Sequence, residues 1–357
     1  EQTAQTNIGW DLGFFDGRMN IGGDFYYKKT TDLFTNVDVS PINGITSYIM
    51  NNGDMLNKGF SISLNGYPVK TKNFRWYMST YYSVNLNKVQ TDDARNYNLN
   101  DYLNGTAVVS GQPISTFYSY KFLGLNPQNG APMFDDWEDR WHLLQGKTLD
   151  EVVPMILVNS GTRDPKFSGD LNNTFTYKNW SLSLNFSYSL GSKVRLFEMY
   201  GPIINGISAA ANVREEFLDR WQVPGDEKYT VYPLIISPSS PDYEHYRLHY
   251  SAPQRAVGPN SGVPAFANNV WQMYDDSDLR VVSGNYLKLQ SLSFSYRLND
   301  RLLRKTPFTQ LSISFNTHNC FTISAKELRG QDPSQAGFAD AGLSIRPSYT
   351  IGLNVSF

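Results

Sequence analysis

Strict alternation of apolar and small polar side chains is the feature that most constrains this chain. Between Trp180 and Leu190, every even position is apolar or aromatic, and every odd position is serine or asparagine. A period of two places successive side chains on opposite faces of a β-strand, whereas an amphipathic helix repeats every 3.6 residues. The segment is therefore predicted to be a strand with one apolar face and one polar face.

The same alternation recurs along most of the chain. It is found at residues 60–65, 74–86, 291–298, 311–316 and 349–357. Two further alternating runs, 8–14 and 19–27, flank Asp16-Gly17, and Asp-Gly between two such runs is a strong hairpin signal. With a short strand expected near Ala131–Asp135, we predict an all-β fold of about eleven strands.

The composition of the polar face favours a transmembrane barrel over a soluble sandwich. Soluble sheets usually carry charged side chains on their water-facing side, but here that face is mostly Ser, Asn and Thr. Only 18% of the residues are charged and 14% are aromatic, against roughly 25% charged in ordinary soluble domains. Aromatic residues near the strand ends, such as Trp76, Tyr82 and Trp180, match the interfacial girdles of outer-membrane barrels. We therefore predict a transmembrane antiparallel β-barrel.

The connections between predicted strands alternate in length. Short turns are expected at 16–17, 67–73 and 178–179, and a moderate one at 299–307. Long connections are expected at 30–54, 89–112, 137–166, 191–279 and 319–348. Short periplasmic turns opposite long extracellular loops are the layout of bacterial outer-membrane barrels, which have even strand numbers. An odd count of about eleven predicts that the chain forms part of a barrel.

The C-terminal segment carries the most specific pattern. Its apolar positions are Tyr349, Ile351, Leu353, Val355 and Phe357, and each position between them is small or polar. A closing strand ends at the membrane interface, where a terminal aromatic ring anchors it. The arrangement resembles the signal read by the outer-membrane barrel assembly machinery, so we predict that these five residues form a barrel-assembly signal.

Several segments in order along the chain resemble SusC/RagA-type TonB-dependent outer-membrane transporters. These segments are 7–15, 24–33, 52–60, 164–169 leading into 175–180, 219–226, 284–289, 330–333 and the terminal strand. The resemblance spans nearly the whole chain and identifies residues 1–357 as a C-terminal portion of such a barrel.

The resemblance implies a 22-stranded barrel in the bacterial outer membrane, with a plug domain inside it. It further implies energy delivered by TonB through the plug, and a SusD-like lipoprotein acting as a lid over the extracellular mouth. Cargo in this family is typically oligosaccharide and sometimes peptide. The plug and the earlier strands are absent from this chain, and no signal-peptide pattern opens it. An open sheet edge is not viable in lipid, so the missing half is expected to accompany the chain as a partner.

Other chemistry is weakly indicated. A net charge of −2 gives no electrostatic basis for nucleic-acid binding, and the single Cys320 excludes an intrachain disulfide or a thiolate-cluster metal site. His245 and His249 are four residues apart, but their loop-like surroundings favour solvated histidines over metal ligands. Two acidic runs, 135–139 and 275–278, could hold calcium in loops, the alternative being ordinary charged loop residues. No cofactor, resident metal or catalytic residue is predicted.

Aromatic residues in the long connections are candidates for contact with a lid or with cargo. Residues 212–221 are predicted to form a short amphipathic helix that presents Phe217 and Trp221 on one side. Loop packing is the alternative for that helix and for the remaining candidates, Trp137, Trp141, Trp271 and Tyr274.

Together these features predict an outer-membrane nutrient importer that does no chemistry on its substrate. Two alternatives stay open from the sequence. One is a soluble extracellular all-β protein that binds or hydrolyses carbohydrate, and the other is a passive porin without a plug.

Overall fold

The fold is taken from a computed structural model. It describes residues 1–38, 42, 44–45, 47–51, 53–90, 97–135, 137, 140–203, 212–235, 239–240, 243, 245, 256–257, 263–264, 269–334 and 346–357. No helix in these ranges is long and apolar enough to cross a membrane.

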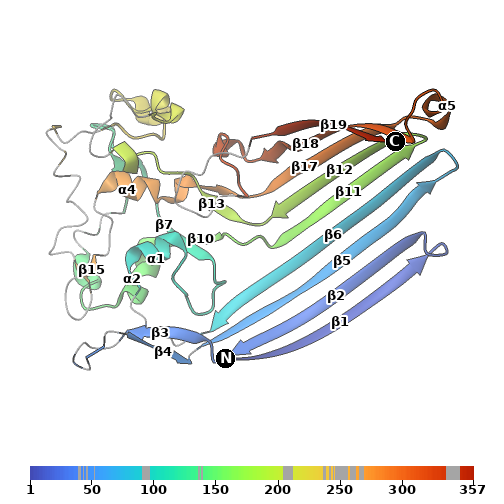
Figure 1. Ribbon diagram of the computed structural model, residues 1–357. Helices are drawn as coiled ribbons and strands as arrows, with labels where there is room; N and C mark the ends of the chain where they lie inside the picture. Colours follow the sequence, from blue (N-terminus) through green and yellow to red (C-terminus); the bar gives the residue numbers. More distant parts are fainter. Residues whose placement is uncertain are drawn as a thin grey trace.

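A nine-stranded antiparallel sheet dominates the described part of the chain (Figure 1). Its strands, in spatial order, are β1 (Gln2–Phe14), β2 (Met19–Thr31), β5 (Asp54–Lys70), β6 (Phe74–Gln90), β11 (Phe167–Tyr177), β12 (Trp180–Leu190), β17 (Tyr286–Arg297), β18 (Gln310–Ser324) and β19 (Ser348–Ser356). The spatial order of these nine strands is the same as their order in the sequence, and each pairs with the next, so the sheet is an up-and-down meander. This confirms the all-β class.

The prediction of about eleven barrel strands is wrong for the described residues. The difference arises in the connection between β6 and β11. The strand expected near Ala131–Asp135 reduces to β9 (Pro132–Met133), which pairs only with β8 (Gly124–Leu125). Neither joins the large sheet, because both lie inside one long connection from β6 to β11. The alternation of short turns and long connections is preserved with nine strands.

The remaining short elements lie in the long connections. The strands are β3 (Phe34–Asp38), β4 (Ser47–Asn51), β7 (Thr116–Tyr120), β10 (Leu157–Thr162), β13 (Lys193–Arg195), β14 (Ala256–Val257), β15 (Val263–Pro264) and β16 (Val281–Ser283). The α-helices are α1 (Leu99–Asn104), α2 (Leu149–Ile156), α4 (Val270–Asp275) and α5 (Asp300–Leu303). The 3-10 helices are η2 (Trp141–Leu143), η3 (Gly201–Ile203), η4 (Glu215–Asp219), η5 (Asp226–Lys228), η7 (Asp278–Arg280) and η8 (Lys326–Leu328).

The strand register aligns the sequence alternation into two continuous faces. Leu182 of β12 lies between Phe175 of β11 and Phe294 of β17, and one position along, Ser183 lies between Thr174 and Ser293. We call the first face the apolar face and the second the polar face. Since a one-residue slip would exchange the faces, the apolar positions fix the register.

Glycines allow close packing of aromatic rings across neighbouring strands. The ring of Tyr26 covers Gly59, where an added Cβ would lie 2.6 Å from the Tyr26 hydroxyl and 2.0 Å from the Val84 carbonyl oxygen. Tyr188 covers Gly169 in the same way, with its hydroxyl 2.5 Å from such a Cβ. These positions accept only glycine without a shift of the neighbouring strand.

Both edges of the sheet are open. All thirteen residues of β1 are exposed, including those on its polar face, and seven of the nine residues of β19 are exposed as well. An unpaired row of backbone N–H and C=O groups is not viable in a lipid bilayer.

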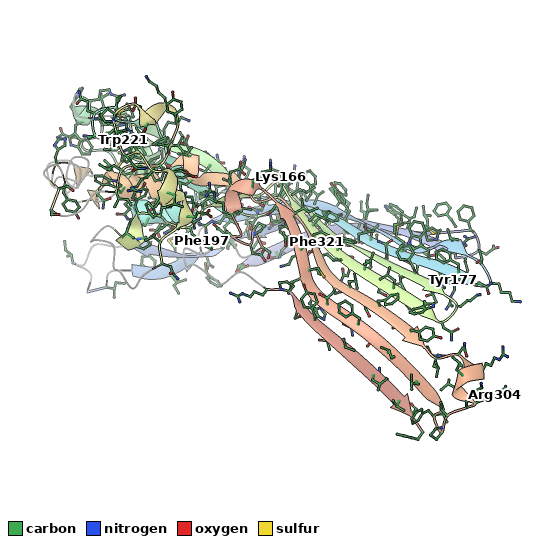
Figure 2. All side chains as sticks on the ribbon, turned by 90° about the horizontal axis from the view of Figure 1, so that it is seen from above. Lys166, Tyr177, Phe197, Trp221, Arg304 and Phe321 are labelled. Carbon is green, nitrogen blue, oxygen red and sulfur yellow. The ribbon has the colours of Figure 1, made fainter. Side chains whose placement is uncertain are left out.

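The long connections gather at one end of the sheet and the short turns at the other (Figure 1). Figure 2 shows the sheet curving along its width, with Tyr177 and Arg304 at the turn end and Phe197 and Trp221 in the mass of loops opposite.

Candidate functional site: the loop domain and the polar face

Two connections far apart in sequence fold together into one packed unit. The described residues of 97–166, between β6 and β11, and of 191–285, between β12 and β17, share a single buried core, and we call this unit the loop domain. Its most buried side chains are Tyr102, Leu103, Tyr120, Leu144, Val152, Met199, Tyr200, Val270, Trp271, Met273 and Tyr274. The loop domain therefore has a hydrophobic core of its own, in contrast to the open sheet.

Arg195 joins the two halves of the loop domain. Its Nη1 donates to the Leu103 carbonyl oxygen at 2.7 Å, and its Nη2 donates to the Tyr118 carbonyl oxygen at 2.6 Å. The Asp276 carboxylate lies 3.0 Å from Nη1. The guanidinium also lies over the Phe117 ring, 5.4 Å from its centroid. A planar guanidinium can satisfy several acceptors at fixed angles, which a lysine cannot.

Asp275 organises the backbone of the second connection. Its carboxylate accepts three backbone N–H groups, those of Met199, Tyr200 and Gly201, each at 2.8 Å. Burial raises the pKa of Asp275 to about 6, because loss of solvation outweighs the opposing effects of Arg280 and the three donors. The neighbouring Asp276 carboxyl has a raised pKa for the same reason, despite its ion pair with Arg195.

The acidic run at 275–278, predicted as a possible calcium site, is occupied by protein partners. Asp275 binds backbone N–H groups, Asp276 binds Arg195, and Asp278 pairs with Lys121 at 2.6 Å. Within the described residues no group of three or more metal-binding side chains converges. Part of the other acidic run (136, 138 and 139) lies outside those residues, as does His249.

A cavity of about 360 Å³ opens beside these buried charges. Its lining combines apolar side chains with Glu216, Tyr274, Arg280, Lys326 and Arg329. The Arg280 guanidinium donates to the Phe197 carbonyl oxygen, but its Nε and the Tyr274 hydroxyl have no hydrogen-bond partner among the described residues. The cavity is a candidate pocket for a small polar ligand or ordered water.

The last long connection is tied to the same unit. Lys288, on the polar face of β17, forms an ion pair with Asp332 at 3.0 Å, and both side chains are almost fully buried. Gln331 next to it accepts the Phe197 backbone N–H at 3.1 Å and donates to the Arg195 carbonyl oxygen at 3.3 Å. Three connections are thus cross-linked above one end of the sheet.

Below the loop domain, small hydrogen-bonding side chains line the polar face. Thr174 and Ser183 lie 3.1 Å apart through their hydroxyls, and Ser293 donates to Asn316 at 2.7 Å. On β2, the Tyr26 hydroxyl donates to Asn85 at 2.8 Å. These small polar side chains can form hydrogen bonds with water. Because they are short, they take up little of the width of a barrel lumen.

The structure buries all six loop aromatics, five of them in the core of the loop domain and Trp221 over Gly130. Trp137, Trp141, Phe217, Trp221, Trp271 and Tyr274 are each at most 9% exposed. Stacking on a sugar ring or on a lid requires an exposed face, which these side chains do not offer in this conformation. Their observed role is loop packing, the alternative that the sequence left open.

The helix predicted at 212–221 is shorter than expected. Only residues 215–219 are helical, as the 3-10 helix η4, and Phe217 is buried while Leu218 is 73% exposed. Trp221 lies beyond the end of η4, so the amphipathic helix expected to carry both Phe217 and Trp221 does not form.

The predicted assembly segment forms the edge strand β19. Tyr349, Ile351 and Leu353 are exposed on the apolar face, and the Phe357 ring packs against Phe308 at 5.3 Å between centroids. Recognition of this strand by the assembly machinery stays a prediction.

The buried network around Arg195, Asp275 and Arg280 was not found from the sequence. The acidic run drew attention, but its partners lie about eighty residues away in the chain. Nothing local marks Arg195 as a buried residue.

Comparisons with known proteins give a consistent result. No protein-family model matches the chain. It is 24% identical, over its whole length, to "TonB-dependent receptor P3" of Formosa agariphila, and covers 34% of that protein. It is 28% identical over 57% of its length to "TonB-dependent receptor SusC" of Bacteroides thetaiotaomicron, and covers 20% of that protein.

The fold also matches solved structures. The RagAB peptide transporter superposes with a TM-score of 0.70 and 20% identity, over 99% of this chain and 35% of that one. The "open-open" state of the RagAB peptide importer gives 0.69. The chain therefore spans about a third of the length of the proteins it matches most fully.

Proposed function

We propose that this chain, a portion of the outer-membrane barrel of a SusC/RagA-type TonB-dependent transporter, forms one wall and part of the extracellular mouth of a nutrient importer. The observation that carries the proposal is a two-faced sheet with open edges, crowned at one end by a packed loop domain. The relatives that match the chain are named as receptors and a transporter, which supports a role in transport without catalysis.

The open edges of the sheet determine which further protein segments the chain needs in a membrane. Further strands must pair with β1 and β19 before the sheet can stand in lipid. A barrel of the size implied by the resemblance, 22 strands, leaves a lumen that a plug must fill. We therefore propose that the partners are the remaining barrel strands and plug, with TonB acting through the plug.

Cargo is proposed to be oligosaccharide or peptide, captured under a SusD-like lipoprotein. Two features support this: the solved neighbour is titled a peptide transporter, and the polar face offers many hydroxyl and amide groups without dense charge. In this mechanism the cross-linked loop domain holds the mouth in shape, while the force-bearing movement takes place in the plug.

Paired cysteine variants of the complete transporter test the orientation of the wall. Ser183→Cys and Leu184→Cys are adjacent on β12 but lie on opposite faces; both are made in a Cys320→Ser background. In outer-membrane vesicles, we expect a water-soluble maleimide to label the first and a membrane-dissolved maleimide to label the second. The opposite labelling, or no labelling of the second by the lipid reagent, would contradict the wall assignment.

Energy dependence distinguishes active import from the passive porin. Cells carrying the transporter are given labelled oligosaccharide or peptide mixtures with and without a protonophore. We expect uptake to require both the proton-motive force and TonB. Uptake that persists without either one would leave the wall assignment intact but replace the importer with a porin.

A further inference from the structure

The apolar face of the sheet carries charge in one place only. Among the described residues of its nine strands, the charged side chains on this face are Lys29, Asp54, Lys58 and Lys88. Every other apolar-face position of the nine strands is uncharged, while the polar face has its charges scattered from β1 to β17. A charged side chain on a lipid-facing surface is costly and is a functional-site candidate by default.

The register brings the three lysines together. Lys29 of β2 and Lys88 of β6 flank Leu56 of β5 in one cross-strand row, and Lys58 lies two residues along β5 in the next row. Neighbouring strands are about 4.8 Å apart, so the backbones of Lys29 and Lys88 are only about 10 Å from each other. Flexible lysine side chains can converge across that span.

The charges of Lys29, Asp54, Lys58 and Lys88 do not balance. Lys29 pairs with Asp54 at 3.0 Å, whereas Lys58 and Lys88 have no ion-pair partner among the described residues. The four groups sum to a net charge of +2, and the three lysines are all exposed. Like charges held this close repel one another, and an anion placed between them removes the repulsion.

The position of the three lysines along the strands matches the expected level of the lipid headgroups. On β6 the apolar-facing positions carry no charge from Phe74 to Leu86, thirteen residues, which at a strand tilt near 40° corresponds to about 31 Å, against about 25 Å for the usual lipid-facing band. Lys58 lies opposite Leu86 at the end of this band and Lys88 lies two residues beyond it, at the end of the sheet that carries the long connections (Figure 1). In an outer-membrane barrel that end faces outward.

We propose that Lys29, Lys58 and Lys88 form a binding site for the phosphate of an anionic outer-leaflet lipid, whose acyl chains lie along the adjacent apolar surface of Phe25, Phe60 and Tyr82. This rests on the outer-membrane placement of the sheet, but not on the identity of the cargo or on TonB. The site anchors one lipid at the seam of β2, β5 and β6.

Retention of lipid by the complete transporter in detergent tests the site. The probes are purified phosphorylated lipid A and the same lipid A with its phosphates removed, counted on the protein by native mass spectrometry. We expect tight retention of the phosphorylated form and weak retention of the dephosphorylated form. Since each lysine near an anionic surface is worth about fivefold in affinity, Lys58→Gln/Lys88→Gln together should weaken binding about 25-fold.

Two further variants keep the test sharp. Lys28→Gln removes a lysine adjacent to Lys29 in sequence but on the polar face, and should leave retention unchanged. Asp54→Asn frees Lys29 and should tighten binding. Heat-dependent gel mobility confirms that each variant is folded.

Equal retention of the two lipid forms would overturn the site, as would an equal loss in Lys28→Gln and Lys58→Gln/Lys88→Gln, or weaker binding in Asp54→Asn. Because uptake is not measured, none of these results depends on the import proposal.

Discussion

Asp275 is the residue whose replacement should most directly loosen the loop domain. Its carboxylate is the acceptor for three consecutive backbone N–H groups, at residues 199–201, and it is 2% exposed. Asp275→Ala leaves all three donors buried without a partner. Each unsatisfied buried donor costs about 1–3 kcal/mol, so the expected loss is about 3 kcal/mol when all three donors stay unpaired and each costs the lower value.

Hydrogen exchange of the complete transporter measures this loss locally. A loss of about 3 kcal/mol in local opening corresponds to amide exchange roughly 150-fold faster. We expect that acceleration at residues 199–201 and in the contacting helix α4, with little change in β11 and β12, whose ladder is independent of Asp275. Asp275→Asn keeps one acceptor oxygen and should give a smaller effect.

The matched control is Asp219→Ala, which removes an exposed carboxylate from the same domain. It should leave exchange at 199–201 unchanged. If Asp275→Ala exchanged at the wild-type rate there, or if both variants accelerated exchange equally, the role given to the Asp275 carboxylate would be refuted.

Four other outcomes follow from the structure. Arg195→Met leaves the Asp276 carboxylate, whose side chain is 20% exposed, without its ion pair, which costs up to about 3 kcal/mol, so limited proteolysis should cut the loop domain faster, and Arg195→Lys should not restore resistance. Gly59→Ala places a Cβ 2.0 Å from a backbone oxygen of the next strand, and should reduce the heat-modifiable folded form, whereas Gly13→Ala, whose nearest neighbour is 3.4 Å away, should not. Because the pKa of Asp275 is raised to about 6 from about 3.9 when unfolded, the folded domain binds more protons between these values. Its stability therefore falls as pH rises through that window, by up to about 3 kcal/mol, and exchange corrected for intrinsic rates should be slower at pH 4.5 than at pH 7. Phe357→Ala should lower the amount of barrel inserted in the outer membrane, as measured by fractionation.

The sheet could be predicted from the sequence because its determinants are local. In β12 the alternation of apolar and polar residues shows which face of the sheet each side chain lies on. The register with β17 then follows from matching apolar positions such as Leu182 and Phe294. The turn at Asp16-Gly17 was predictable for the same reason, since both residues adopt positive φ.

The loop domain could not be predicted in this way. Its core joins residues such as Leu103 and Met199, and its polar contacts join Arg195 to Tyr118 and Asp275 to the backbone at 199–201. These pairings depend on how two long connections fold against each other, and no periodicity records them. The strand expected near Ala131–Asp135 failed here, because only Pro132 and Met133 are extended and they pair with Gly124 and Leu125 of the same connection.

The corrected strand count also constrains what completes the barrel. Bacterial single-chain barrels have an even number of strands, and the described residues of this chain contribute nine strands to the sheet. If the sheet belongs to a complete barrel, as proposed above, an odd number of further strands would close it, thirteen if the total is the 22 that the resemblance implies. Since β1 runs from the loop end to the turn end and β19 runs the same way (Figure 1), these two edges cannot pair antiparallel with each other. For an antiparallel barrel to close, the first and the last of the additional strands must both run opposite to β1 and β19. An odd number of strands with alternating direction meets this requirement.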